Sequence, residues 1–180
     1  MKNLIILVLF LFLIHDTITA QKAQLMLLAG QSNAVGQGDS LKSPVCQPNT
    51  AFEFDASANQ FIPLKDPVGK PWKLFQIAGT GSVAPSFAKR FNEFTGKSVY
   101  LVTAARGGSS CHVKGEMSNY DTWDTSGQLL EQAIEKTKMA ELKLGSQLAG
   151  IIWMQGERDA NAILNSQMTA IEYEDALESL

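Results

Sequence analysis

Three short segments of the chain carry residue types that suit attack on an acyl carbonyl. They are Gly30-Gln31-Ser32-Asn33, Gly107-Gly108-Ser109 and Gln155-Gly156-Glu157. A serine hydroxyl becomes an effective nucleophile when a base takes its proton and nearby donors stabilise the resulting oxyanion. Paired glycines let a backbone N–H approach a reacting centre, and a carboxamide supplies a further donor. These segments predict acyl-transfer chemistry at Ser32, provided that the fold brings them together.

Each segment also has a purely structural explanation when it is taken alone. A serine directly after a strand commonly caps the next helix, and a lone Gly-Gly pair commonly marks a turn. Glycines at Gly79 and Gly81 do not form a phosphate-binding loop, because no Gly-Lys-Ser/Thr follows them. No His/Cys cluster has metal-ligand spacing, so we expect chemistry without a metal or other cofactor.

Each segment follows a nearly continuous apolar run of the kind that forms buried parallel strands. The three runs are Leu25–Leu28, Val99–Val102 and Ile151–Met154. An amphipathic helix is predicted over Ala84–Phe94, and a second helix begins after a capping-box pattern at Thr125 and Gln128 and ends at Gly145. The alternation of strand and helix predicts a three-layer α/β/α fold with a central parallel sheet. Because carboxyl ends of parallel strands share one edge, the three segments should converge there.

Two other regions complete the predicted domain. The segment from Asp39 to Thr80, rich in Pro, Gly, Asn and Asp, is interpreted as a long insertion over the carboxyl edge of the sheet. The segment from Tyr173 to Leu180 has a helical pattern without a stop signal, so we expect the domain to be incomplete at its C-terminus.

The composition indicates an exported globular domain. With 180 residues, 45% hydrophobic and 18% charged residues and a net charge of -3, the chain suits a single core and does not favour nucleic acid as a partner. Lys2 and the apolar run Leu4–Ile14 predict a signal peptide over residues 1–20, followed by a mature domain over residues 21–180. The run is too short for a membrane span, so we expect a periplasmic or extracellular protein without stable membrane insertion after cleavage. In that oxidising setting, Cys46 and Cys111 could be bridged or could both be buried thiols.

The motifs resemble those of a known family. The three segments, together with Gly81–Ala88, are similar to conserved blocks of the SGNH hydrolases, in the sialate O-acetylesterase and acetylxylan esterase branch, carbohydrate esterase family six. The resemblance covers about Gln24 to Asp159. It implies a flavodoxin-like fold and removal of O-acetyl groups from carbohydrates such as sialic acid or xylan, through an acyl-serine intermediate on Ser32.

The resemblance also implies roles for individual residues. The oxyanion hole would consist of the Ser32 N–H, the Gly108 N–H and the Gln155 side chain. The supporting residues would be Gln31, Asn33, Gly107 and Glu157, and Asp159 would be structural.

The sequence departs from the family in its histidines. The family takes its general base from an Asp-x-x-His block near the carboxyl end, whereas this chain has only His15, in the predicted signal peptide, and His112. We therefore expect a truncated copy with weak or no hydrolysis of its own. One alternative is a carbohydrate-binding pseudoenzyme that stacks sugars on Trp72, Trp123 or Trp153. Another is an SGNH lipase or thioesterase, which the Gln-Gly-Glu segment disfavours.

Overall fold

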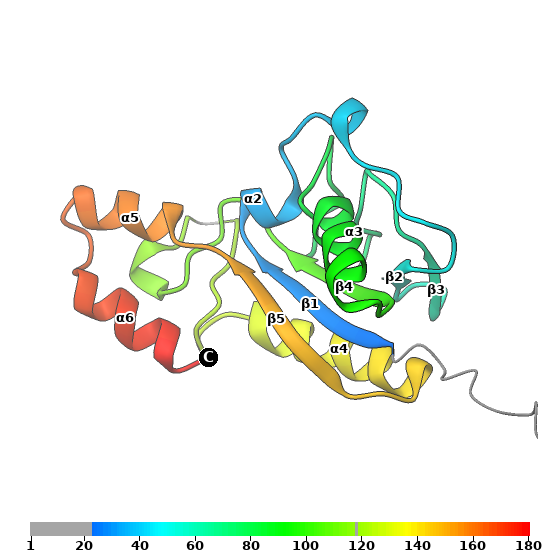
Figure 1. Cartoon of the computed structure of the whole chain (residues 1–180). Helices are drawn as coiled ribbons and strands as arrows, with labels where there is room; N and C mark the ends of the chain where they lie inside the picture. Colours follow the sequence, from blue (N-terminus) through cyan, green and yellow to red (C-terminus); the bar gives the residue numbers. More distant parts are fainter. Residues whose placement is uncertain (1–22, 118) are drawn as a thin grey trace, which may run out of the picture.

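The computed structural model describes residues 23–117 and 119–180, and Figure 1 shows one sheet with helices around it. The predicted signal peptide, residues 1–20, lies outside the described residues. The sheet has the strand order β3-β2-β4-β1-β5. The strands are β1 (Gln24–Gly30), β2 (Ala51–Asp55), β3 (Gln60–Pro63), β4 (Val99–Ala105) and β5 (Leu148–Met154).

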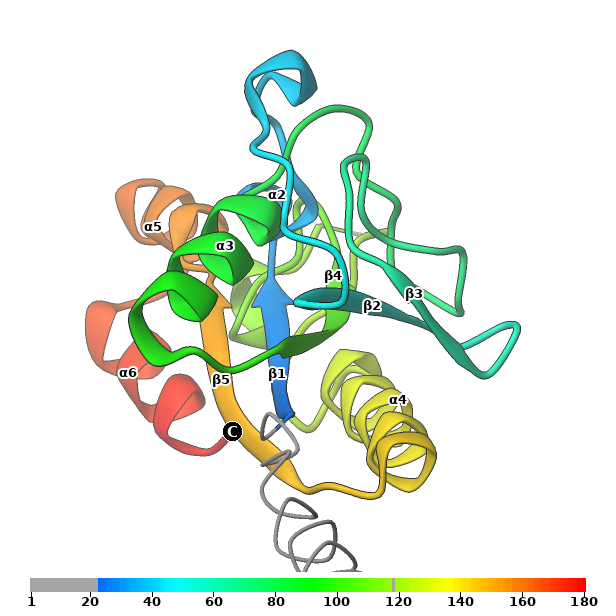
Figure 2. The ribbon, with the colours of Figure 1, turned by 45° about the vertical axis from the view of Figure 1, so that its right-hand side comes forward.

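Helices cover both faces of this sheet, which confirms the predicted three-layer α/β fold. Helix α3 (Ala84–Thr95) lies in front of the sheet in Figure 1, and α4 (Leu129–Leu144) lies behind it. Figure 2 shows the same two helices on opposite sides of β1. The short helix α2 (Ser32–Val35), α5 (Glu157–Leu164) and α6 (Ala170–Glu178) follow the carboxyl ends of β1 and β5. Two 3₁₀ turns, η1 (Ser40–Lys42) and η2 (Val113–Gly115), lie in the loops.

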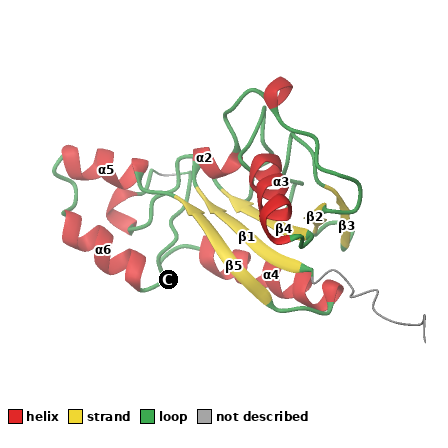
Figure 3. Cartoon of the chain, viewed as in Figure 1, coloured by secondary structure: helices red, strands yellow, loops and turns green. Residues whose placement is uncertain are grey.

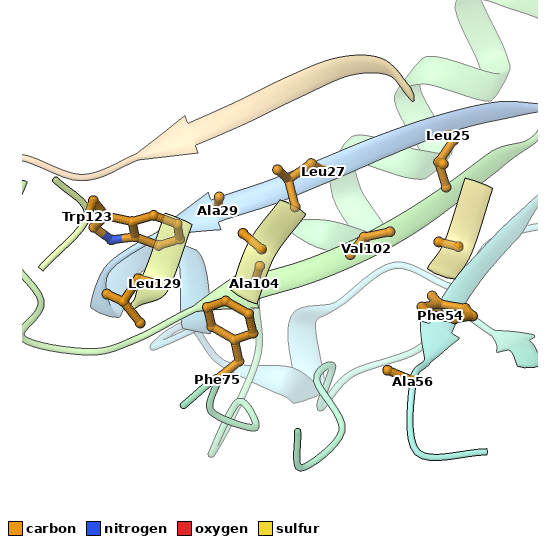
Figure 4. Packing of buried hydrophobic residues seen from close by; sticks show 12 residues of the cluster. Leu25, Leu27, Ala29, Phe54, Ala56, Phe75, Val102, Ala104, Trp123 and Leu129 are labelled. Carbon is orange, nitrogen blue, oxygen red and sulfur yellow. The ribbon is translucent and has the colours of Figure 1, made fainter. Parts of the chain in front are cut away.

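Alternate residues of the central strands supply two separate hydrophobic cores. Leu25, Leu27 and Ala29 of β1 point toward α4 and pack with the cluster drawn in Figure 4. Leu28 belongs to the other cluster, which includes Ala88 of α3. Successive side chains of a strand point to opposite faces, so a strand covered on both faces must be apolar throughout. Burial on both faces therefore explains the continuous apolar runs in the sequence.

The central strands run parallel and end at the same level. In the register of β1 with β4, Gly30 lies opposite Ala105, and in the register of β1 with β5 it lies opposite Met154. The residues that follow these three strands therefore emerge at one edge of the sheet, as the sequence predicts.

The segment from residue 39 to residue 80 differs from its prediction as a loop insertion. It is mostly loop (green in Figure 3), but its middle forms β2 and β3, which extend the sheet. Strand β2 pairs in parallel with β4, while β3 pairs antiparallel with β2. A later part crosses the carboxyl edge: Phe75 packs in the core on the α4 side and Ala78 in the core on the α3 side.

The predicted C-terminal end of α4 is confirmed, whereas the predicted N-terminal capping box is wrong. The predicted capping box at Thr125 is wrong, because α4 has Gln128 as its N-cap without a side-chain capping bond. Instead the Asp121 carboxylate accepts the Gln128 backbone N–H at 3.3 Å. Gly145 ends α4 in the left-handed region with φ 69°, as predicted. A capping box does occur at α6, between Thr169 and Glu172.

Both cysteines are free thiols in the structure. Cys46 is half-buried, and Cys111 is fully buried beside the carboxyl ends of the strands. Burial raises the pKa of the Cys111 thiol to about 12, and the carboxylates of Asp159 and Asp124 add to this effect. A thiol that stays protonated is a poor nucleophile, so Cys111 has a packing role. Within the part of the chain that the structure describes, no helix is long and apolar enough to cross a membrane.

A buried lysine, Lys136, lies on the face of the sheet that α4 covers. The Lys136 side chain is fully buried, and its Nζ donates to the Thr103 carbonyl oxygen at 2.6 Å. Its ammonium lies 5.9 Å from the Trp72 ring and 5.8 Å from the Phe75 ring. Burial lowers the pKa of Lys136 to about 8, and the nearby carboxylate of Glu53 opposes this shift. The protonated lysine therefore costs folding free energy at neutral pH.

This cost predicts a pH dependence of stability. Between about pH 8 and pH 10.5 the unfolded chain binds the Lys136 proton more strongly than the folded chain, so wild-type stability should rise with pH relative to Lys136→Met. One unit of pKa displacement corresponds to about 1.4 kcal/mol, so the relative gain should be on the order of 3 kcal/mol. Urea unfolding at a series of pH values measures it. Lys138→Met, an exposed position on the same helix, should show no such trend, and parallel curves for wild type and Lys136→Met would contradict the assignment.

Candidate active site

Ser32 lies directly beyond the end of β1, as the first residue of α2. The N-cap position of α2 belongs to Gln31, so Ser32 does not cap the helix. The Ser32 side chain is half-buried. Neither its hydroxyl nor its backbone N–H has a hydrogen-bond partner among the described residues. Both groups therefore have a free hydrogen-bonding capacity.

Gln31 connects the end of β1 to the start of α5. Its side chain is only 4% exposed. The Gln31 Oε1 accepts the backbone N–H of Arg158 at 3.1 Å and that of Gly156 at 3.4 Å. These bonds satisfy amides at the beginning of α5 that have no partner within the helix. Gln31 thus fixes the first predicted segment against the third.

The Gly107-Gly108 turn follows β4 and lies beside Ser32. A Cβ on Gly107 would lie 3.9 Å from both the Cα and the Cβ of Ser32. Gly108 has φ 78°, and a Cβ there would come within 2.8 Å of the Tyr120 ring. This position thus requires glycine for both conformation and space. The Gly108 N–H has no acceptor among the described residues, so it remains available as a donor.

Gln155 reaches the same edge from β5, but its amide points into the protein. Its Nε2 donates to the Asp159 carboxylate, and it lies 3.3 Å from both the Gln31 Oε1 and the Ser109 carbonyl oxygen. The Gln155 Oε1 is buried without a hydrogen-bond partner among the described residues. An oxyanion-hole donor must direct its N–H at the substrate. The role of Gln155 in such a hole therefore stays a prediction, and what the structure shows is a link between the three segments.

Asp159 is the residue on which this link depends. It is fully buried on the first turns of α5. Its carboxylate accepts the backbone N–H of Cys111 at 2.8 Å and that of His112 at 3.0 Å, besides the Gln155 amide. Three donors on two oxygens compensate a buried charge. Asp159 therefore ties the loop after β4 to α5, in agreement with the expected structural role.

Glu157 and Asn33 meet at the rim of the site. The Asn33 Nδ2 donates to the Glu157 Oε1, and both side chains are exposed. The carboxylate can thus reach solvent and any ligand near Ser32. No group of three or more His, Cys, Asp or Glu side chains suited to holding a metal occurs in residues 23–117 and 119–180.

His112 has a structural task of its own. Its Nδ1 accepts the Lys114 backbone N–H at 3.0 Å and so caps the η2 turn. No imidazole of the described residues is within hydrogen-bond contact of Ser32.

Two residues that sequence reasoning missed flank the Gly-Gly turn. The Oε1 of Gln76 accepts the Gly107 N–H at 2.7 Å. The Tyr120 ring, 37% exposed, covers Gly108 and lies 5.9 Å from the Arg106 guanidinium. Both reach the site from loops without periodic patterns, and only their polar or aromatic character could have suggested them.

The three tryptophans have mainly packing roles. Trp123 is buried, and it packs edge-on against Trp153 with ring centroids 5.0 Å apart. Trp72 is half-buried and stacks on Phe75. Trp123 and Trp153 also line an apolar cavity of about 420 Å³ between α4, β5 and α6. None of the predicted site residues lines this cavity.

The sequence of the chain matches a known family. A family model described as "Carbohydrate esterase, sialic acid-specific acetylesterase" matches residues 22–180. The chain belongs to this family. The predicted membership in the sialate O-acetylesterase branch is thereby confirmed.

One curated relative matches the chain at low identity. "Probable carbohydrate esterase At4g34215" of Arabidopsis thaliana is 24% identical over 152 residues, which cover 76% of this chain and 54% of that protein. The chain thus spans about half the length of the curated relative that it matches.

Two solved structures share the fold. The crystal structure of NanS has a TM-score of 0.55 at 18% identity, over 89% of this chain and 65% of that one. The X-ray structure of the Arabidopsis protein AT4G34215 has a TM-score of 0.54 at 21% identity, over 86% of this chain and 69% of that one.

The structural role of Asp159 can be tested by Asp159→Asn. Asparagine offers one acceptor oxygen and an NH₂ group, so at least one of the three converging N–H donors would lose its acceptor. We expect the free energy of unfolding to fall by ~1–3 kcal/mol. Urea unfolding followed by tryptophan fluorescence measures the change. Asp175→Asn, exposed on α6, is the matched control, and an equally small effect in both variants would argue against the link.

Proposed function

We propose that this carbohydrate esterase removes O-acetyl groups from a sugar, of the sialic acid or xylan type, with Ser32 as the nucleophile. In the reaction the Ser32 oxygen attacks the acetyl carbonyl carbon, and its proton passes to a base. The sugar hydroxyl leaves with a proton, and water then releases acetate from the acyl-serine. The observation that carries the proposal is the open Ser32 hydroxyl beside a glycine turn whose Gly108 N–H is also open.

Stabilisation of the oxyanion would come first from backbone donors. The N–H groups of Ser32 and Gly108 have no acceptor among the described residues, so they can bind a developing negative charge without losing an existing bond. Gln155 would join them as a third donor if its amide turned from Asp159 toward the substrate. Gln31, Gly107 and Asp159 would hold the positions of these donors, and Asn33 and Glu157 would border the site.

A cleft that is lined by Asn33, the residue after Ser32, supports a carbohydrate ligand; Ser32 itself is not part of its lining. The cleft has a volume of about 500 Å³, within the range of small-molecule sites. Its lining mixes polar and apolar groups: Asn33, Gln37, Gly38, Gly81, Ser82, Val83 and Met154. Amides, a hydroxyl and backbone groups are the partners that sugar hydroxyls need. The apolar cavity on the α4 side is separate from this cleft, so it gives no support to a lipase or thioesterase function.

The described residues do not supply an evident general base for Ser32. Because His112 caps η2 and no described imidazole contacts Ser32, we propose that the 180-residue chain by itself hydrolyses esters slowly. A serine hydrolase site without its base retains some rate enhancement from the oxyanion hole, on the order of 10³-fold over water in the serine proteases. The same observation favours the second candidate function, a carbohydrate-binding protein that cuts no ester.

Ser32→Ala tests the proposed nucleophile. We expect acetate release from O-acetylated sialic acid or acetylxylan, and labelling by a fluorophosphonate, to fall to background in Ser32→Ala. Ser86→Ala, on the exposed surface of α3, should behave as wild type. Unchanged hydrolysis in Ser32→Ala would reject the nucleophile. Sugar binding by wild type without any hydrolysis or labelling would favour the binding protein.

Export is proposed from the N-terminal sequence alone. We expect a signal peptidase to cleave near Ala20 and to deliver the protein to the periplasm or the outside of the cell. N-terminal sequencing of the protein recovered from its producing cell measures the cleavage. A protein that begins at Met1 in the cytoplasmic fraction would contradict the proposal.

A further inference from the structure

Gln76 lies where the chain crosses the carboxyl edge of the sheet. Its neighbour Phe75 packs in the core on the α4 side, and Ala78 packs in the core on the α3 side. The backbone N–H of Gln76 donates to the carbonyl oxygen of Ala105, the last residue of β4, at 3.0 Å. The crossing segment is therefore fixed directly beside the point at which the Gly-Gly turn begins.

The Gln76 side chain reaches from this anchor to the turn. Its Oε1 accepts the Gly107 N–H at 2.7 Å, a short bond for an amide donor. A Cβ on Gly107 would lie 3.0 Å from this oxygen and 3.9 Å from the Ser32 Cβ. Gln76 therefore contacts the turn on the part that borders Ser32.

Because of this bond, the two glycine amides differ: one is bonded, and the other is free to bind a ligand. The Gly107 N–H is occupied by Gln76, whereas the Gly108 N–H has no acceptor among the described residues. On the other side of the turn, the Tyr120 ring packs against Gly108. A glycine pair is the most flexible dipeptide in a chain, so a donor on it needs such external support to keep its direction.

We propose that Gln76 is a positioning residue of the esterase: its carboxamide oxygen holds the Gly107 N–H and thereby directs the free Gly108 N–H toward the oxyanion that forms at Ser32. This inference rests on the proposed function. Preorganised donors stabilise a transition state because they need no reorientation during the reaction. Gln76 acts through the glycine turn and has no direct part in bond making or breaking. Gln76 is an exposed residue, and its Nε2 has no partner among the described residues.

The test uses the full chain and two substitutions of Gln76. Gln76→Met keeps the length of the side chain but removes the acceptor oxygen, and Gln76→Glu keeps an acceptor at the same reach. Gln147→Met, exposed before the amino end of β5, is the matched control. The first readout is the amide-proton chemical shift and exchange of Gly107 and Gly108. The second is phosphonylation of Ser32 by a fluorophosphonate, resolved into the affinity for the reagent and the maximal rate.

We expect Gln76→Met to move the Gly107 and Gly108 amide resonances and to speed exchange at Gly107, while Gln76→Glu keeps the Gly107 signal close to wild type. Phosphonylation of Gln76→Met should lose about tenfold in maximal rate with little change in reagent affinity, as expected when about one hydrogen bond of transition-state support is lost. A general loss of structure would instead change both constants and the unfolding midpoint, and Gln147→Met should change none of them.

The results separate this inference from the proposed function. If wild type is labelled at Ser32 and Gln76→Met is labelled equally fast, the positioning role is wrong while the nucleophile stands. If wild type is not labelled at all, the proposed function fails, and the glycine amide signals alone decide whether Gln76 holds the turn. Unchanged Gly107 and Gly108 signals in Gln76→Met overturn the inference in either case.

Discussion

The site depends on the parallel register of β1 with both of its neighbours. Gly30, Ala105 and Met154 lie level across three strands, so the residues after them must share one edge. The approach of β5 to β1 is close at this point: a Cβ on Gly30 would lie 2.1 Å from the Met154 carbonyl oxygen. Only glycine tolerates such an approach together with its φ of 137°. The two hydrophobic cores, one on each face of the sheet, hold this register in place.

Main-chain amides, rather than charged pairs, join the three segments at that edge. Gln31 accepts amides at the start of α5, Asp159 accepts amides of the loop after β4, and Gln76 accepts the amide of Gly107. Each acceptor lies on a different part of the chain from its donors. The segments therefore restrain one another. The free donors near Ser32 are the N–H groups that have no acceptor in this network. Such a frame suits chemistry in which an oxyanion must meet donors that are already oriented.

Sequence reasoning found what periodicity and topology determine, and it missed what single long-range contacts determine. The apolar runs marked β1, β4 and β5, and parallel strand ends placed Ser32, Gly107 and Gln155 at one edge. Strand β2 escaped notice because its buried Glu53 interrupts the apolar pattern, and that carboxylate finds the Gly69 N–H and Thr103 only in the folded chain. The direction of the Gln155 amide likewise depends on Asp159, four residues later in α5.

Asp159 holds the loop after β4 through backbone groups, and this affects which substitutions the loop tolerates. Asp159 bonds to the backbone at position 112, and the side chain there is only half-buried. Any amino acid with an N–H, and so any except proline, can preserve that anchorage. Exchange of the side chain at position 112 therefore keeps the bond to Asp159 but removes the cap that the His112 imidazole gives to the η2 turn. Residue 112 thus has two separable tasks: its backbone anchors the loop to α5, and its side chain shapes the short turn that follows.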